Sequence, residues 1–283
     1  MDSIEIPLCD LPKQLAEIPH PPKKLFCVGK VPRKDGKYLV AVGSRNHSVY
    51  AQEACRKIIS ELAGTDIYIV SGLALGIDTV AHETALAVGL STIAFPGSGL
   101  DASVLYPASN FALAERILQN GGALISEFPK KFRATPWGFP RRNRLMAGIA
   151  HAVLVVEATE KSGTLITARM ALDYNRDVLA VPGEITTPFA KETNNLIRQG
   201  ATPITCGDDI REIFGIEKSE VQEKNTDTLS PQQKEILELV AQNKSLEEIY
   251  SLFSGTISEC IVALTALEID GFDLPKKTFN ATN

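Results

Sequence analysis

The sequence predicts an α/β fold, with an extended Rossmann-like parallel sheet followed by a small C-terminal winged-helix-like domain. Short apolar segments alternate with segments of helical apolar spacing, which is typical of βαβ units with helices on both faces of a sheet. The apolar segments are nearly continuous runs, as expected of parallel strands that are buried on both sides. A length of 283 residues fits one large and one small domain, at about 100–200 residues per domain.

The Rossmann-like domain is expected to cover residues 38–216, behind an extended lead-in at residues 1–37 whose prolines disfavour helices. Apolar runs predict strands at residues 38–42, 67–70, 91–95, 123–126, 153–156 and 178–181. Helical spacing of apolar residues predicts helices at residues 50–63, 80–88, 107–118, 165–174 and 193–199. Between the fourth and fifth strands we expect a long, irregular, basic segment.

The C-terminal part of the chain predicts a separate small domain. Residues 217–228 are polar, lack apolar periodicity and are interpreted as a linker. Ser230 is expected to cap a helix that begins at Pro231. Two further short helices and a hairpin at residues 271–279 would complete a winged-helix-like domain at residues 229–283. That domain has four basic and eight acidic side chains, and its third expected helix has no Lys or Arg. We therefore expect it to be a protein-contact or self-association module rather than a domain that binds duplex DNA.

The composition excludes several classes of protein. Hydrophobic residues make up 44% and charged residues 22% of the chain, which disfavours a disordered or fibrous protein. No apolar run approaches the roughly 18 residues that a membrane-spanning helix needs. The N-terminus lacks a basic region followed by an apolar core, so no secretory signal is expected. The five scattered cysteines contain no CxxC pair, so we expect no zinc site, no disulfide framework and a cytoplasmic location.

One segment is strongly basic although the whole chain carries a net charge of −5. Residues 130–144 contain six basic side chains and no acidic one. The candidate DNA-binding residues in it are Phe139, Arg141, Arg142, Asn143 and Arg144. Basic side chains beside an aromatic ring suit a groove that tracks a nucleic-acid backbone and stacks a base. The alternative is a solvated loop whose arginines pair with nearby acids, and the lack of acids within the run favours binding.

Small polar residues follow three of the expected strands, where ligands of open α/β sheets bind. Gly43, Ser44 and Arg45 follow the first strand, Ser71, Gly72, Ala74 and Gly76 follow the second, and Ser162, Gly163 and Thr164 follow the fifth. The second and third of these loops precede helices, whose N-terminal amides favour an anion such as phosphate. The alternative for the loop at residues 71–76 is a tight strand-to-helix turn. The alternative for the loop at residues 162–164 is a Ser/Thr helix cap with a turn glycine. Both loops would face one crevice.

Catalytic groups are scarce in this sequence. None of the HExxH, GxSxG or GxxxxGK[ST] motifs is present. Asp78 can cap the helix behind Gly76, and Glu157 at a strand end is interpreted as a structural carboxylate bonded to loop amides. We therefore assign no catalytic residue, no metal site and no cofactor.

Taken in order, these motifs resemble one known family. They are Gly43-Ser44-Arg45, residues 71–78, Gly99-Leu100-Asp101 with Tyr106-Pro107, Ser126-Glu127, residues 139–144, Glu157 with residues 162–165, Val181-Pro182-Gly183 and Gln199-Gly200-Ala201. Over about residues 11–214 the chain is similar to the DNA-processing protein A (DprA/Smf) family. It departs from the family's pattern at Gly89-Leu90, where a Gly-Gly pair is frequent, and at Glu192, where a glycine commonly stands.

The resemblance implies a function that composition alone does not indicate. Members of that family bind incoming single-stranded DNA during natural transformation, protect it, and load the RecA recombinase onto it. They have an extended Rossmann fold and usually form dimers. By the resemblance, Arg45 and residues 139–144 contribute to a positively charged DNA pocket, which residues 71–76 and 162–164 shape.

Two other function classes stay open at this point. One is a nucleotide-binding or nucleoside-monophosphate-cleaving enzyme of the lysine-decarboxylase-like Rossmann type, which has similar phosphate loops but devotes an Arg and a Glu to chemistry. The other is a nucleotide-sensing interaction module. Release of a free base from nucleoside monophosphates would identify the enzyme, whereas salt-dependent binding of oligonucleotides favours the DNA-binding protein.

Overall fold

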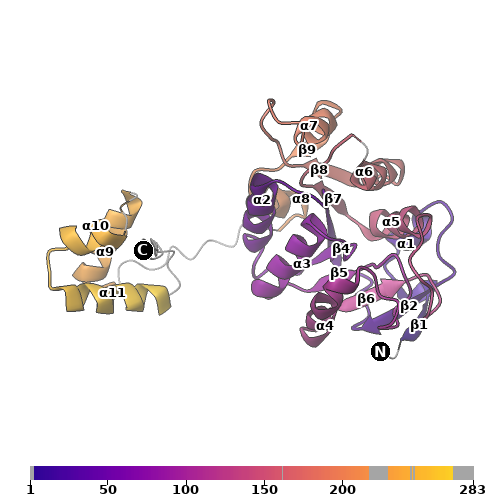
Figure 1. The fold of residues 1–283 in the computed structure, drawn as a ribbon, viewed down its shortest axis with the longest axis horizontal. Helices are drawn as coiled ribbons and strands as arrows, with labels where there is room; N and C mark the ends of the chain where they lie inside the picture. Colours follow the sequence, from indigo (N-terminus) through magenta and orange to yellow (C-terminus); the bar gives the residue numbers. More distant parts are fainter. Residues whose placement is uncertain (1–2, 161, 217–228, 243, 245, 270–283) are drawn as a thin grey trace. The chain divides into compact units, whose positions relative to one another are not determined.

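The computed structural model describes residues 3–160, 162–216, 229–242, 244 and 246–269. The chain divides into two compact units, residues 1–217 and residues 218–283. The first unit is the α/β unit, and the second is helical where it is described (Figure 1). None of the described helices is long and apolar enough to span a membrane.

The first unit is built on one nine-stranded sheet. Its strands are β1 (Ile4–Pro7), β2 (Lys24–Gly29), β3 (Lys37–Val42), β4 (Ile67–Ser71), β5 (Thr92–Ala94), β6 (Ala123–Ser126), β7 (Ala152–Val155), β8 (Asp177–Ala180) and β9 (Thr202–Pro203). Their order in the sheet is β1-β2-β6-β5-β4-β3-β7-β8-β9. The six strands expected from apolar runs are all present, and each pairs with its neighbours among them in parallel.

The lead-in at residues 1–37 differs from expectation, because it adds two strands to this sheet. β1 pairs antiparallel with β2, and β2 pairs antiparallel with β6, so the sheet is not parallel throughout. The prolines of the lead-in lie outside β2 and therefore do not interrupt this strand. Within β2, Leu25 and Cys27 are buried at alternate positions. An antiparallel strand can close the edge of a parallel sheet without a crossover connection.

Helices cover both faces of the sheet (Figure 1). They are α1 (Gln14–Glu17), α2 (Val49–Ser60), α3 (Ile77–Ala87), α4 (Phe111–Gln119), α5 (Gly138–Ile149), α6 (Gly163–Asp173), α7 (Lys191–Arg198) and α8 (Gly207–Ile213). Val40 and Val42 of β3 pack in the core with α1, α5 and α6. Leu39 and Ala41 pack on the other face with α2, α3 and α8. The alternation of strand side chains thus divides one apolar run between two helical layers.

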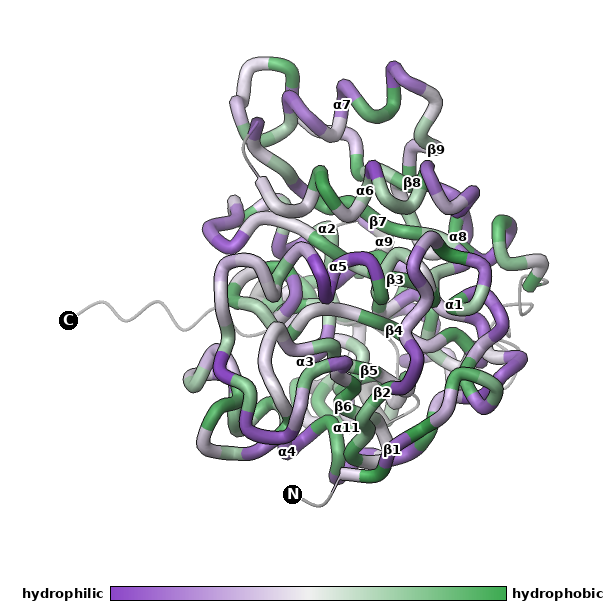
Figure 2. Tube along the Cα trace, turned by 90° about the vertical axis from the view of Figure 1, so that its right-hand side faces the viewer, coloured by the Kyte–Doolittle hydropathy of each residue, from purple (hydrophilic) through white to green (hydrophobic). Residues whose placement is uncertain are grey.

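The basic segment before β7 also differs from expectation, because residues 138–149 form the regular helix α5. Pro140 is tolerated there because it lies in the first turn, where backbone N–H groups have no partner within the helix. Leu145, Met146 and Ile149 bury one side of α5 against the sheet. Figure 2 shows the hydrophilic stretch of α5 in purple. Because this stretch is helical, its polar residues are placed on a regular element rather than on a loop.

The second unit contains three helices at the expected places. They are α9 (Pro231–Ala241), α10 (Leu246–Leu252) and α11 (Ile257–Ile269). Ser230 caps α9 as expected, since its side chain accepts a hydrogen bond from the Gln233 backbone while the Gln233 side chain accepts one from Ser230. A small core contains Ile236 and Leu267. The expected linker at residues 217–228 and hairpin at residues 271–279 lie outside the described residues.

Candidate functional site

A cavity of about 400 Å³ lies beyond the carboxyl ends of β3 and β7. The chain runs from β3 to β4 on one side and later returns to β7 on the other, so this is the switch point where open α/β sheets bind ligands. We call the cavity the crevice. Its lining is Val42, Gly43, Ser44, Arg45, Asn46, Ala74, Asp78, Phe139, Arg142, Asn143, Met146, Thr159, Ser162, Gly163, Thr164 and Thr167.

The loop after β3 supplies an exposed cation to the crevice. Arg45 is exposed, and its guanidinium lies 5.4 Å from the centre of the Phe139 ring. Among the described residues it has no ion pair and no hydrogen bond. Ser44 shapes the turn, since its hydroxyl accepts a hydrogen bond from the Asn46 backbone at 3.2 Å. Arg45 is therefore free to pair with a ligand anion.

The loop after β4 is mainly structural. The Ser71 hydroxyl is buried and donates to the Ala41 carbonyl at 2.7 Å. Gly76 has a φ of +81°, and a side chain there would come within 2.3 Å of the Ser44 carbonyl. Ser71, Gly72 and Gly76, three of the expected DNA-binding residues, therefore hold the loop and do not line the crevice, whereas Ala74 does line it.

Asp78 and Arg142 are both buried beside that loop. The Asp78 carboxylate accepts hydrogen bonds from the backbone of Gly72 at 3.0 Å and of Ala74 at 3.3 Å, rather than capping its helix. Burial raises the pKa of Asp78, although Arg142 and the loop amides oppose the shift. Burial also lowers the pKa of Arg142 to about 10, still far above neutrality. Both groups stabilise the loop conformation.

Arg142 itself is only 5% exposed. One of its terminal nitrogens, Nη1, donates to the carbonyls of Gly72 and Phe95, which follow β4 and β5. A side chain at Gly72 would lie 1.9 Å from this nitrogen. Arg142, expected as a DNA-binding residue, thus ties two loops together, and it borders the crevice as a fixed positive charge.

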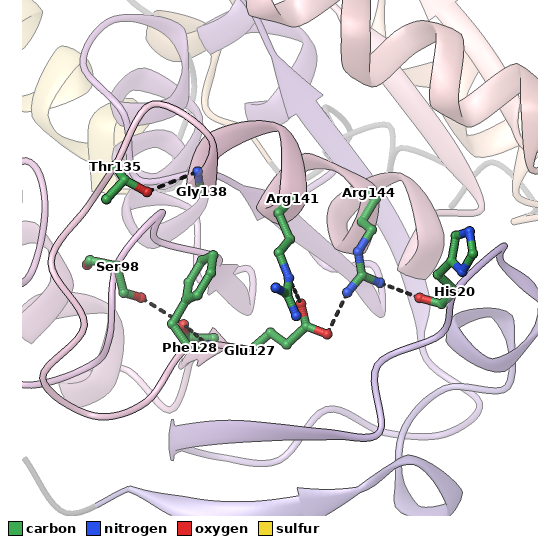
Figure 3. Close-up of polar contacts among 9 residues, drawn as sticks. His20, Ser98, Glu127, Phe128, Thr135, Gly138, Arg141 and Arg144 are labelled. Carbon is green, nitrogen blue, oxygen red and sulfur yellow. Dashed lines mark hydrogen bonds and ion pairs between the residues drawn. The ribbon is translucent and has the colours of Figure 1, made fainter.

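Arg141 and Arg144 are paired with one acid. Arg141 Nε donates to Glu127 at 2.7 Å, and Arg144 Nη2 donates to the other Glu127 oxygen at 2.5 Å (Figure 3). Arg144 also donates to the His20 carbonyl at 2.8 Å. Burial would raise the pKa of Glu127, but the hydrogen bonds from both arginines outweigh it and lower the pKa. For these two arginines the alternative of pairing with a nearby acid is correct, and neither lines the crevice.

The N-terminus of α6 forms the opposite wall of the crevice. The Ser162 hydroxyl accepts a hydrogen bond from the Thr164 backbone at 3.2 Å, which caps the helix as the alternative interpretation expected. Thr164 Oγ1 donates to the Gly43 carbonyl at 3.0 Å and joins this loop to the one after β3. A side chain at Gly163 would meet no atom within 4 Å. The helix terminus therefore faces open space, where its dipole favours an anion.

Phe139 and Asn143 complete the crevice from α5. Phe139 is half-buried, and its ring packs at 5.8 Å on Tyr106 as well as beside Arg45. Asn143 is mostly buried, and its amide lies 3.5 Å from the Gly163 carbonyl. The crevice thus offers an aromatic surface next to a free guanidinium and a helix N-terminus.

Groups suited to acid–base catalysis are held in structural roles. Glu157 is buried and accepts hydrogen bonds from the Ser48 hydroxyl at 2.5 Å and the Ser48 backbone at 3.1 Å, as expected for a structural carboxylate. Burial lowers the pKa of His82 to about 3. Among the described residues no group of three or more His, Cys, Asp or Glu could hold a metal ion.

Sequence reasoning missed several crevice residues. Asn46 and Thr159 lie in the loops that were singled out, one position after Arg45 and three positions before Ser162. Their place after expected strands was a usable signal. Met146 and Thr167 come from the interiors of α5 and α6, and nothing in the local sequence indicates that they reach the crevice.

Comparisons of sequence agree on one family. The profile of the DNA recombination-mediator protein A family matches residues 7–215. Protein Smf of Escherichia coli is 42% identical over 201 residues, which are 71% of this chain and 53% of that protein. DNA processing protein DprA of Bacillus subtilis is 34% identical over 232 residues, 82% of this chain and 75% of that protein. The chain spans about half the length of the Smf proteins of E. coli and Synechocystis.

Solved structures agree with the sequence comparison. DprA from Streptococcus pneumoniae superimposes with a TM-score of 0.69 at 35% identity, covering 75% of this chain and 74% of that one. DprA from Helicobacter pylori superimposes with a TM-score of 0.67 at 30% identity, covering 76% of this chain and 96% of that one. These matches confirm the Rossmann-like α/β fold and the resemblance seen in the sequence. This chain belongs to the DNA recombination-mediator protein A family.

Proposed function

We propose that this protein binds single-stranded DNA in the crevice, with a phosphate between Arg45 and the N-terminus of α6 and a base on Phe139. The observation that carries the proposal is the size and lining of the crevice. A volume of about 400 Å³ lies in the range of small-ligand pockets, so it admits a nucleotide but not a duplex. A base reaches such a pocket only when it is outside a base stack, which favours single strands.

The relatives support this proposal. The H. pylori DprA structure was described for a unique single-stranded DNA binding mode, and the B. subtilis and S. pneumoniae relatives are called DNA processing proteins. We extend the proposal to the role that the resemblance implies: the protein acts as a homodimer, protects incoming strands and loads RecA onto them during transformation or recombination. Formation of RecA filaments on strands already covered by another binding protein measures this loading.

The crevice favours binding over nucleotide cleavage. Cleavage of a nucleoside monophosphate needs a carboxylate that reaches the substrate and that can take up or release a proton. The Asp78 carboxylate is bonded to two loop amides beside Arg142. Glu157 is bonded to Ser48 and is not among the residues that line the crevice. Incubation with nucleoside monophosphates should therefore release no base, and release would favour the enzyme.

Titration with single- and double-stranded oligonucleotides at several salt concentrations tests the proposal. We expect single strands to bind more tightly, with little sequence preference and with an affinity that falls linearly on a log–log salt plot. Equal affinity for duplex, or binding without salt dependence, would contradict the proposed site.

The second unit should contribute little to DNA binding. Residues 229–283 carry twice as many acidic as basic side chains, so phosphates are repelled there. A chain truncated after Ile216 should bind a single-stranded oligonucleotide within a few-fold of the full chain. A loss above a hundredfold, about 3 kcal/mol, with the fold intact would show that the acidic unit takes part in binding.

A further inference from the structure

We propose that a bound single strand continues from the crevice onto a second stacking platform, formed by the exposed indole of Trp137 with the cations Lys131 and Arg133 of the same segment. The inference rests on the proposed binding of single-stranded DNA and adds a site for a further base outside the crevice. Its starting point is an aromatic ring that is 54% exposed on a basic segment.

The Trp137 ring is held in place by other aromatic rings. Phe128 and Phe132 stack with their centres 4.3 Å apart, and Trp137 meets both edge-on, at 5.8 and 5.4 Å. The backbone beneath them is anchored, since Gly99 donates to the Phe132 carbonyl at 2.8 Å. A ring fixed in this way loses little conformational entropy when a base stacks on its exposed part.

Trp137 also lies close to the crevice along the chain. It immediately precedes α5, and Phe139, which lines the crevice, is two residues later. The Cα atoms of residues two apart are separated by at most about 7.6 Å, twice the spacing of consecutive Cα atoms. An extended single strand crosses such a distance within about a nucleotide or two, so one strand can reach both rings.

The charges around Trp137 suit a phosphate backbone. Lys131 and Arg133 are exposed. In the part of the chain that the structure describes, Arg133 has no ion pair or hydrogen bond. Two acids lie near this segment. Glu127 pairs with Arg141 and Arg144, and the Asp101 carboxylate accepts hydrogen bonds from Ser103. An exposed aromatic ring on a segment with exposed cations matches the combination by which proteins bind single strands without sequence preference.

The sole tryptophan of the chain makes the platform directly observable. The full-length protein is titrated with unlabelled oligothymidylate while tryptophan emission is recorded, and binding is followed in parallel by anisotropy of a labelled oligothymidylate. We expect emission to be quenched in step with binding, because a stacked base quenches indole fluorescence. Oligonucleotides too short to extend beyond the crevice should bind with little quenching.

Substitutions at Trp137 provide the second readout. Trp137→Ala should weaken binding of long oligothymidylate by roughly 5- to 150-fold, the equivalent of one lost stack, and leave short oligothymidylate unchanged. Trp137→Phe should retain part of the affinity, which keeps the test valid if the alanine variant folds poorly. Leu172→Ala, which removes another exposed apolar side chain, is the matched control and should bind as the unsubstituted chain does.

Several outcomes would overturn the platform. If oligothymidylate binds by anisotropy while tryptophan emission and the affinity of both Trp137 variants stay unchanged, the platform is wrong and the crevice proposal stands. If no oligonucleotide binds, both proposals fail. An emission shift that depends on protein concentration but not on DNA would show that another copy of the chain covers Trp137.

Discussion

Replacing Arg45 by alanine removes the one crevice arginine that is exposed and has no protein partner among the described residues. Its guanidinium is held near the binding position by the Phe139 ring, 5.4 Å away, and the N-terminus of α6 faces the same space. The substitution deletes a cation without disturbing a buried contact. We therefore expect the stability of the fold to be nearly unchanged and binding of single-stranded DNA to weaken.

The size of the effect follows from the removal of a single guanidinium–phosphate interaction. A charge-assisted hydrogen bond contributes about 1.5–3 kcal/mol, so affinity at low salt should fall by roughly 10- to 150-fold. One phosphate contact on a single strand contributes about 0.7 to the slope of log affinity against log salt. The affinity ratio between the unsubstituted chain and Arg45→Ala should then shrink by about 2.6-fold when salt rises from about 50 to 200 mM.

Fluorescence anisotropy with a labelled oligothymidylate at several salt concentrations measures both quantities. Arg141→Ala is the matched control, because it removes an equal charge from a guanidinium that already pairs with Glu127 at 2.7 Å. We expect the control to keep most of the affinity. If Arg45→Ala leaves the slope of log affinity against log salt unchanged, Arg45 does not contact a phosphate. If Arg141→Ala lowers that slope equally, the effect comes from the loss of net charge and not from a contact of Arg45.

Four further substitutions test the site and its support. Phe139→Leu should keep the fold but lower affinity by about 1–3 kcal/mol, the cost of one lost stack; a large fall in melting temperature with unchanged affinity would show a core role. Gly72→Ala places a methyl group 1.9 Å from the buried Arg142 guanidinium, so the urea midpoint of unfolding should fall by the equivalent of about 1–3 kcal/mol. Its control is Gly163→Ala, whose methyl group meets nothing within 4 Å and should not lower the midpoint. Because its arginine partners outweigh burial and lower the pKa of Glu127 from 4.5, the stability it contributes is present above that pH and lost as the pH falls through the lowered pKa. Glu127→Gln should flatten this acid limb in urea midpoints measured from about pH 3 to 7, and an unchanged limb would contradict the assignment.

The strands from β3 to β8 were predictable because each is a short apolar run bounded by turn residues. A strand that is buried on both faces needs such a run of apolar residues, and the run can be recognised from consecutive positions of the sequence. The strands of the lead-in were not recognised, because the apolar run of β2 lies within a segment rich in lysine and proline, although Leu25, Cys27 and Val28 are buried. α5 was also missed. Its first turn contains Gly138 and Pro140, which usually break helices, and packing against the sheet overrides that preference.

The loops that line the crevice were predictable from the sequence, because the loops that follow parallel strands lie at one edge of the sheet. This placement does not depend on the contacts of their side chains. The tertiary structure alone decided which charges are free to bind. Arg142 is bonded to Gly72, 70 residues away in the sequence, and Arg144 to Glu127, 17 residues away. A count of neighbouring acids cannot reveal such partners, because the partner of a charge is set by distance in space and by burial. Of the arginines singled out in the sequence, the fold fixes Arg142, pairs Arg141 and Arg144 with Glu127, and leaves Arg45 exposed beside an aromatic ring.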